Sequence, residues 1–179
     1  MSVQLLPNVP TQIMFDDAKN NVPSFTWLQW IQSVVDLINR VVSNRVTASG
    51  AAAVTCNGAV QSTGVGTIGI NPQRYAELWI NARVTFNLSA PGTLYVYVVR
   101  TLGAIPANGA APGGSDVIVA ADAFAGPATV GGQNMSGALS WIDSGLDQTK
   151  KYLYYFAVKG TNALTANLAA SSQMQVSEL

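Results

Sequence analysis

The first feature of this sequence is a repeat of apolar residues between positions 27 and 42. They form two neighbouring ladders, in which successive members lie three or four residues apart. The first ladder contains Leu28, Ile31, Val35, Ile38 and Val42. The second ladder contains Trp27, Trp30, Val34, Leu37 and Val41. Helices that pack in bundles have this spacing, so the pattern predicts a helix with a wide apolar stripe.

The predicted helix needs partners that cover this stripe. It begins near Ser24 or Thr26, whose hydroxyls can cap its first turn, and it ends by Arg45. A helix of this length forms a stem about 30 Å long. The two ladders together are too wide for one neighbouring helix to cover. We therefore expect several copies of the chain to cover them. The β-branched residues of the first ladder favour a homotrimer. The alternative is that the helix packs against the β domain of its own chain.

After residue 46 the apolar pattern changes from helical to alternating. Between Leu78 and Leu88 every second residue is apolar, with Trp79 as the one apolar residue on the polar side. This alternation predicts a strand with one buried face. Between Thr93 and Arg100 both sides are apolar. That segment is therefore predicted to lie at the centre of a sheet or against another subunit.

The remaining strands are predicted from shorter apolar runs between turn signals. Residues 101–115 are rich in Gly and Pro and form a long loop. Residues 139–143 and 151–159 are expected to form a hairpin, and residues 126–137 are expected to be irregular. About eight strands at intervals of roughly ten to fifteen residues predict a mainly β fold. We expect an antiparallel β-sandwich or jelly-roll head.

The first 23 residues read as an extended arm. Pro7, Pro10 and Pro23 prevent a regular helix and favour open backbone conformations. Such an arm is either a strap that lies on another subunit or a frayed terminus. The predicted organisation is an attachment arm at 1–23, a helical oligomerisation stem at 24–45 and a β head at 46–179.

The charge of the chain is low and balanced. Charged residues make up 10% of the sequence, against about 25% in ordinary soluble domains. This indicates a surface that is partly covered by partners, although a chain rich in Ala and Gly has a similar composition. Nine basic and nine acidic residues cancel, so nothing favours nucleic-acid binding. Four arginines lie between Val41 and Gly114, and we interpret them as solvated or interfacial. They are Arg45, Arg74, Arg83 and Arg100.

Neither a membrane span nor a secretion signal is predicted. Gln29, Gln32 and Asp36 interrupt the apolar ladders, and no run of apolar residues is long enough to cross a bilayer. The N-terminal residues lack a basic start followed by an apolar core, so they do not resemble a signal peptide. We therefore expect the chain to be made in a cytoplasm and to remain soluble or join an assembly there.

Candidate catalytic chemistry is sparse. The chain has no histidine, which excludes Ser-His-Asp triads and His-ligated zinc. Residues 64–69 match G-x-G-x-x-G, but Pro72 blocks the helix that a nucleotide site requires, so we interpret them as a flexible turn. We interpret Cys56 as a small buried residue that packs in the core. Asp143 and Asp147 flank a turn, where Asp residues usually accept local backbone hydrogen bonds. No cofactor, metal or enzymatic activity is predicted.

Two tryptophans are candidates for ligand contact. If they are exposed, Trp79 and Trp141 could stack against sugar rings of a glycan. The alternative is packing in the core or between subunits, because aromatic residues are common in both environments.

The order of these parts resembles small virion structural proteins of tailed bacteriophages. The resemblance rests on the Pro-rich arm, the stretch PSFTWLQWIQS at residues 23–33, a Gly- and Ala-rich neck, and a β head that ends in MQVSEL. It implies a capsid decoration or head-fibre protein located in the virion. In that case residues 1–23 attach to other virion proteins, residues 24–45 form a three-fold stem and the head projects outward. A short tail-fibre or knob protein, whose head binds a host receptor or glycan, is the alternative.

Overall fold

The computed structural model describes residues 15–16, 22–23, 27–35, 45–73, 75–128, 131–161 and 163–178. The chain forms two compact units, Met1–Asn44 and Arg45–Leu179. The first unit contains an antiparallel pair of short strands, β1 (Phe15–Asp16) and β2 (Val22–Pro23), and a helix at residues 27–35. Apart from Arg45, which begins a strand of the second unit, the other positions of the predicted arm and stem lie outside the described residues.

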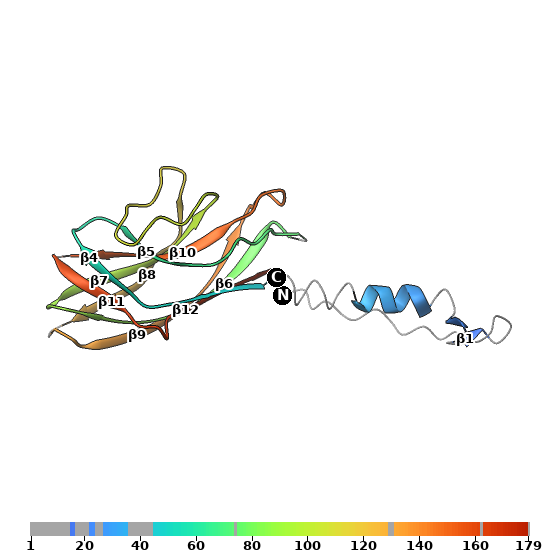
Figure 1. Cartoon of the computed structure of the whole chain (residues 1–179), viewed down its shortest axis with the longest axis horizontal. Coiled ribbons are helices and arrows are strands. Elements are labelled where there is room, and N and C mark those ends of the chain that lie inside the picture. The colour runs from blue at the N-terminus through green and yellow to red at the C-terminus, as the bar shows by residue number, and fades with distance from the viewer. Residues whose placement is uncertain are drawn as a thin grey trace. The chain divides into compact units, whose positions relative to one another are not determined.

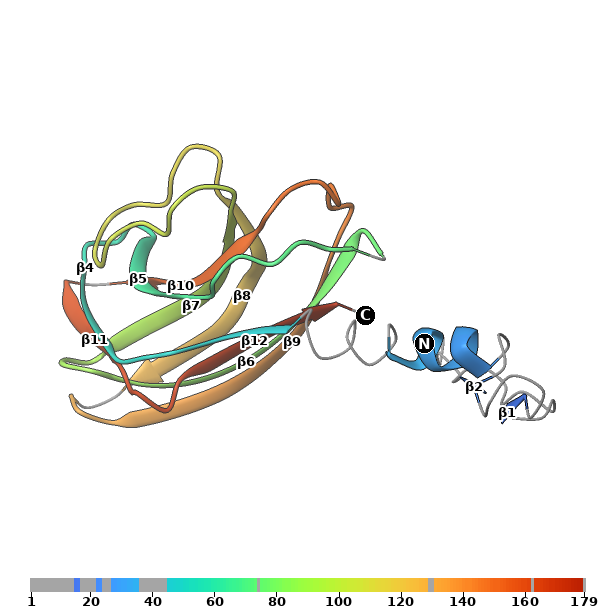
Figure 2. The same ribbon diagram turned by 45° about the vertical axis from the view of Figure 1, so that its right-hand side comes forward.

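The second unit is an antiparallel β-sandwich, which confirms the predicted fold class (Figures 1 and 2). One layer has the strand order β5-β10-β7-β8. Its strands are β5 (Gln61–Gly66), β7 (Gly92–Thr101), β8 (Val117–Ala128) and β10 (Leu153–Gly160). The other layer has six strands in the order β3-β12-β6-β11-β4, with β9 also paired to β6. They are β3 (Arg45–Ser49), β4 (Ala52–Cys56), β6 (Glu77–Leu88), β9 (Asn134–Ser144), β11 (Leu164–Leu168) and β12 (Gln173–Glu178).

Strand β6 organises the larger sheet. On one side it pairs with β9 along almost its whole length, from Glu77 to Asn87. On its other side it pairs first with β12 and then with β11, which follow one another along β6. Strands β3 and β4 continue this arrangement beyond β12 and β11. The larger sheet is therefore four strands wide, although six strands contribute to it.

A four-residue turn, 169–172, interrupts the row formed by β11 and β12. Only two residues of β6, Val84 and Thr85, lie opposite this turn. Ser172 compensates for the lost ladder bonds. Its buried Oγ accepts a hydrogen bond from the Thr85 N–H at 3.1 Å and donates one to the Thr85 carbonyl at 3.0 Å. The N–H of Ala169 also donates to that carbonyl, at 2.9 Å. The backbone of Thr85 thus remains paired where the strand beside it breaks.

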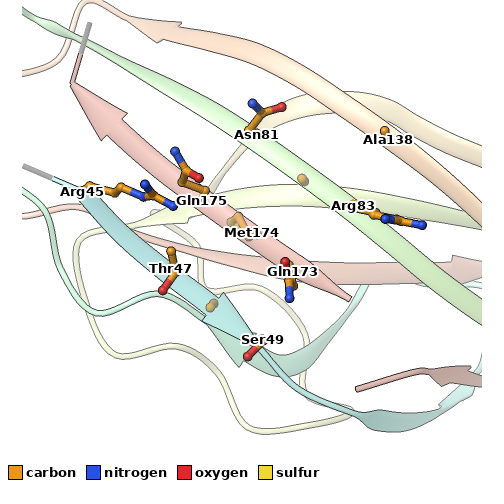
Figure 3. A pocket seen from close by; sticks show the side chains of 11 residues that line it. Arg45, Thr47, Ser49, Asn81, Arg83, Ala138, Gln173, Met174 and Gln175 are labelled. Atoms are coloured by element: carbon orange, nitrogen blue, oxygen red, sulfur yellow. The ribbon is translucent and has the colours of Figure 1, made fainter. Parts of the chain in front are cut away.

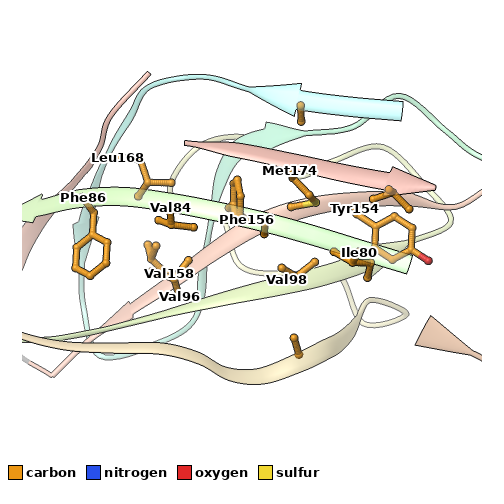
Figure 4. Packing of buried hydrophobic residues seen from close by; sticks show 14 of the residues in the cluster. Ile80, Val84, Phe86, Val96, Val98, Tyr154, Phe156, Val158, Leu168 and Met174 are labelled. Atoms are coloured by element: carbon orange, nitrogen blue, oxygen red, sulfur yellow. The ribbon is translucent and has the colours of Figure 1, made fainter. Parts of the chain in front are cut away.

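The core lies between the two sheets and follows the alternation seen in the sequence. Every second residue of β6 from Leu78 to Leu88 is buried, as predicted. These side chains meet alternate residues of β7 and β10 (Figure 4). Tyr154, Phe156 and Val158 of β10 lie on this inner face, and Cys56 is also buried in the core. Such packed layers supply most of the hydrophobic stabilisation of a sandwich.

Strands β7 and β10 are buried on both faces because a loop covers their outer side. As predicted, β7 lies inside its sheet, between β10 and β8. Its outer residues and those of β10 form a second, smaller cluster beneath the loop that follows β7. This cluster contains Tyr97, Val99, Tyr155 and Ala157, with Ile105 of the loop packed against it. The Asn108 side chain of the loop donates a hydrogen bond to the Ala53 carbonyl at 2.9 Å.

Three local predictions were wrong. Residues 139–143 and 151–159 do not form a hairpin, because β9 pairs with β6 and β10 pairs with β5 and β7 in the other layer. Most of residues 126–137 belong to strands, since β8 continues to Ala128 and β9 begins at Asn134. The G-x-G-x-x-G segment begins inside strand β5. Gly66 is needed there because a Cβ at this position would lie 2.5 Å from the Tyr154 carbonyl oxygen.

Candidate functional site

The helix at residues 27–35 exposes the first predicted ladder. Leu28, Ile31 and Val35 are 47%, 38% and 41% exposed. Trp27, Trp30 and Val34 of the second ladder are half-buried. The two tryptophan rings meet edge to face, with centroids 5.5 Å apart, so their packing is partly satisfied within the helix. The other four candidate interface residues lie outside the described residues. They are Leu37, Ile38, Val41 and Val42.

The clearest polar cluster in the head joins the two sheets. Arg100 of β7 donates through Nη1 to both carboxylate oxygens of Asp143 of β9, at 2.7 and 2.9 Å. The Tyr154 hydroxyl on β10 donates to Asp143 Oδ2 at 2.8 Å. The Arg100 guanidinium also lies 5.5 Å from the centre of the Tyr152 ring. This cluster corrects one interpretation, because Asp143 is not a local backbone acceptor, and it gives Arg100 an ion-pair partner within the head.

The cluster is suited to holding the sheets together. Both oxygens of Asp143 accept hydrogen bonds within the cluster, so neither is directed at a substrate. Burial, and then the adjacent negative charge of Asp143, raises the pKa of Tyr154, so its hydroxyl stays protonated. A group with so high a pKa is a poor general acid or base near neutral pH. The sequence signal for this cluster was Arg100, a charged residue at the end of the otherwise apolar segment that forms β7.

Two further aspartates of the head, Asp116 and Asp147, have structural partners. Asp116 accepts hydrogen bonds from the Tyr155 hydroxyl and the Gly113 N–H, both at 2.8 Å. Burial raises the pKa of the Asp116 carboxyl. The hydrogen bonds that this carboxyl accepts, of which the one from Thr101 has the largest effect, outweigh burial and lower its pKa overall. Asp147 accepts from the N–H and the hydroxyl of Thr149, as expected for an Asp at a turn. Among the described residues, no three His, Cys, Asp or Glu side chains gather into a possible metal site.

Trp79 and Trp141 do not form a joint platform. They lie on adjacent strands but on opposite faces of the larger sheet, because Trp79 pairs with Ile142 and Ile80 pairs with Trp141. Trp79 is half-buried on the outer face, where its Nε1 donates to the Ser140 Oγ at 2.7 Å. Trp141 is 47% exposed and belongs to β9, an edge strand. A ligand that contacts one of them is therefore not held by the other.

The two strands at one edge of the sandwich are long and almost uncharged. Strands β8 and β9 contain no Lys or Arg, although each forms the edge of its sheet. Beside Trp141, the neighbouring Ile142 is 50% exposed, and Val117 and Ile118 of β8 are also exposed. Monomeric proteins usually protect such edges with charged residues, so this edge is suited to contact with a partner.

Comparison with known proteins gives no family. No family model matches the sequence, and no curated protein matches it. Solved structures that match the fold include the following two. One is a chain of the T13 IBDV viral particle, with 11% sequence identity, a TM-score of 0.44 and coverage of 75% of this chain and 30% of that chain. The other is the TNF Eiger from S. frugiperda, with 10% identity, a TM-score of 0.37 and coverage of 76% and 92%.

Similarities of this size establish neither a common family nor a shared function. The chain spans 30% of the length of the IBDV protein, so most of that protein has no counterpart here. No helix among the described residues combines the length and the apolar character needed to cross a bilayer. The function of this chain is therefore inferred from its own surfaces.

Proposed function

We propose that this chain is a non-enzymatic structural protein of a virus particle. Its finer assignment is a trimeric capsid decoration or head-fibre protein of a tailed bacteriophage, in which residues 1–23 attach to the particle. The observation that carries the proposal is the exposed seam of Leu28, Ile31 and Val35 on the helix. An amphipathic helix that leaves its aliphatic face in water is stabilised when copies of the same helix cover that face.

The free energy available from this seam sets a condition on the proposal. Full burial of one such side chain contributes about 1.5–3 kcal/mol. Because the three residues are between 38% and 47% exposed, completing their burial contributes about 2–4 kcal/mol per chain. Association costs about 4–15 kcal/mol in lost freedom of motion. The rest of the two ladders, through Val42, must therefore take part in the stem.

The head offers a second surface that supports assembly. The edge formed by β8 and β9, which contains no Lys or Arg, exposes Trp141 and Ile142. If the stems of three chains associate, their heads are held at high effective concentration, so weak contacts along this edge become significant. The low overall charge is consistent with a surface that is partly covered in this way.

Attachment to the particle is tested by removing residues 1–23 from the chain. Particles that lack the chain are mixed with either the full chain or the shortened chain, and bound protein is measured after sedimentation. We expect the full chain to bind and the shortened chain to remain in solution with its oligomeric mass unchanged. Equal binding of both chains would contradict attachment through the arm.

A tail-fibre or knob protein, whose head binds a host receptor, is the second candidate. The observation that favours it is the exposed Trp141 ring on the head, since exposed tryptophan is a frequent centre of recognition. Trp141→Ala tests it in a cell-binding assay with the full chain, and Leu102→Ala, at another exposed apolar residue, is the matched control. Loss of cell binding with Trp141→Ala alone would favour this candidate over capsid decoration.

A further inference from the structure

The outer face of the larger sheet contains a shallow hollow of about 370 Å³ (Figure 3). Strands β3, β12, β6 and β9 form it, and the cross-strand register defines its rows. Thr47, Gln175 and Asn81 lie side by side in one row, and the small residues Ser49 and Ala138 leave space in the next. The centre of the hollow is thus lined by hydroxyl and amide groups.

Two arginines lie at opposite ends of this hollow. Arg45 is on β3 at one end, and Arg83 is on β6 two rows away. Four residues along a strand and two strand spacings separate their Cα atoms by roughly 17 Å. Neither guanidinium has an ion-pair partner within the described part of the chain. The lining contains no Asp or Glu. Two cations and no acid give the hollow a local positive charge on a protein whose net charge is zero.

The chemistry of this lining selects among possible ligands. Side-chain amides and hydroxyls both donate and accept hydrogen bonds, which matches the hydroxyl groups of a sugar chain. Guanidinium groups bind carboxylate or sulfate groups in a bidentate manner. Nucleic acid fits less well, because two arginines without a longer basic track neutralise few phosphates. An extended peptide fits less well, because it normally binds at a sheet edge through its backbone, and this hollow lies on a face.

We propose that this hollow binds an acidic oligosaccharide, with Arg45 and Arg83 each holding an anionic group. The hydroxyls and amides between them bind the neutral hydroxyls of the same sugar chain. Trp79 lies in the same cross-strand row as Arg45 and is half-buried on the same face of the sheet. This inference does not depend on the stem or on the arm, because every residue of the hollow belongs to the second unit.

The test measures binding of the full chain to three probes by calorimetry. They are a heparin hexasaccharide with sulfate groups, a hexamer of galacturonate with carboxylate groups, and neutral maltohexaose. Arg45→Ala and Arg83→Ala each remove one charged contact. Lys150→Ala is the matched control, because it removes one positive charge from an exposed loop elsewhere on the head. Arg83→Lys keeps the charge but loses the forked geometry.

We expect binding to at least one acidic probe, with a loss of about tenfold or more for either arginine-to-alanine variant. Lys150→Ala should leave the affinity unchanged, and Arg83→Lys should fall between Arg83→Ala and the unaltered chain. The sulfated and carboxylated probes distinguish which anionic group is bound. Binding to none of the probes, equal binding to maltohexaose, or an equal loss with Lys150→Ala would each overturn the proposal. Circular dichroism and oligomeric mass of each variant separate this outcome from a failure to fold or to assemble.

Discussion

Arg100 on β7 donates through one nitrogen to both carboxylate oxygens of Asp143 on β9, so this ion pair connects the two sheets of the head. The Asp143 side chain is almost completely buried, and the Arg100 side chain is 21% exposed. A pair in this environment is desolvated enough for removal of either partner to leave a costly unpaired charge.

Replacing Asp143 with Ala is therefore expected to destabilise the head by about 3 kcal/mol, the lower end of the range for buried pairs, because Arg100 retains some access to water. Urea denaturation followed by tryptophan fluorescence measures this change. Asp147→Ala, at an exposed aspartate that pairs with Lys150 and accepts hydrogen bonds from Thr149 within a turn, is the control and should have a smaller effect. The joint replacement of Arg100 with Met and Asp143 with Leu should restore only part of the lost stability, because it removes the unpaired charge but leaves the buried Tyr154 hydroxyl without its acceptor. A single variant as stable as the unaltered chain would show that the pair contributes little.

Ser172→Ala is expected to destabilise the head by about 1–3 kcal/mol, because the Thr85 N–H loses its acceptor. The neighbouring Ser171 is exposed, so Ser171→Ala is a control that changes the same kind of side chain in the same turn. We expect it to alter stability by less than about 0.5 kcal/mol. Equal effects of the two substitutions in chemical denaturation would mean that Ser172 does not repair the strand break.

The stability of the head is expected to fall in alkaline solution. Burial, followed by the charge of Asp143, raises the pKa of Tyr154 above the value of 10.0 that applies in the unfolded chain. The folded state therefore holds this proton more tightly, and the resulting stabilisation is fully present below about pH 10 and is lost as the pH rises above it. The contribution of Tyr154 to this loss is about 1.4 kcal/mol per pH unit.

Tyr154→Phe should reduce that alkaline slope while lowering stability near neutral pH by about 1 kcal/mol, because Asp143 loses one donor. Denaturation curves between about pH 8 and about pH 12 provide the measurement. The same slope in Tyr154→Phe and in the unaltered chain would exclude Tyr154 as its source.

The parts of the fold that could be predicted from the sequence are those determined by local alternation. Leu78 to Leu88 alternates so regularly that both the strand and its buried face follow from the pattern. The apolar faces of β7 similarly indicated a strand inside its sheet. Strand β9 was partly missed because Gly137, Ser136 and Ala138 give it little apolar contrast. The false hairpin between residues 139 and 159 had the right strands, but the sheet to which each belongs depends on contacts distant in the sequence.

The candidate surfaces were predictable to different degrees. Spacing alone identified Leu28, Ile31 and Val35 as one face of a helix, and all three are exposed in the described helix. Pairing of Arg100 with Asp143 was not predictable, because these residues are 43 positions apart and meet only when the two sheets stack. The hollow between Arg45 and Arg83 was missed for the same reason, since the pairing of β3, β12 and β6 creates it.

Self-association through the helix is the central claim, and Ile31→Asp is the substitution that tests it within the described residues. A carboxylate on the exposed seam would have to be buried between stems, which is strongly unfavourable. Gln29→Asp is the matched control, because it introduces the same charge at an exposed polar position of the same helix.

The mass of the full chain in solution, measured by light scattering after size-exclusion chromatography, is the most direct test. We predict three times the chain mass of 18.7 kDa, or about 56 kDa, for the unaltered chain and for Gln29→Asp, with a fall toward a single chain for Ile31→Asp. An unaltered chain that elutes as an 18.7 kDa monomer at micromolar concentration would contradict the account.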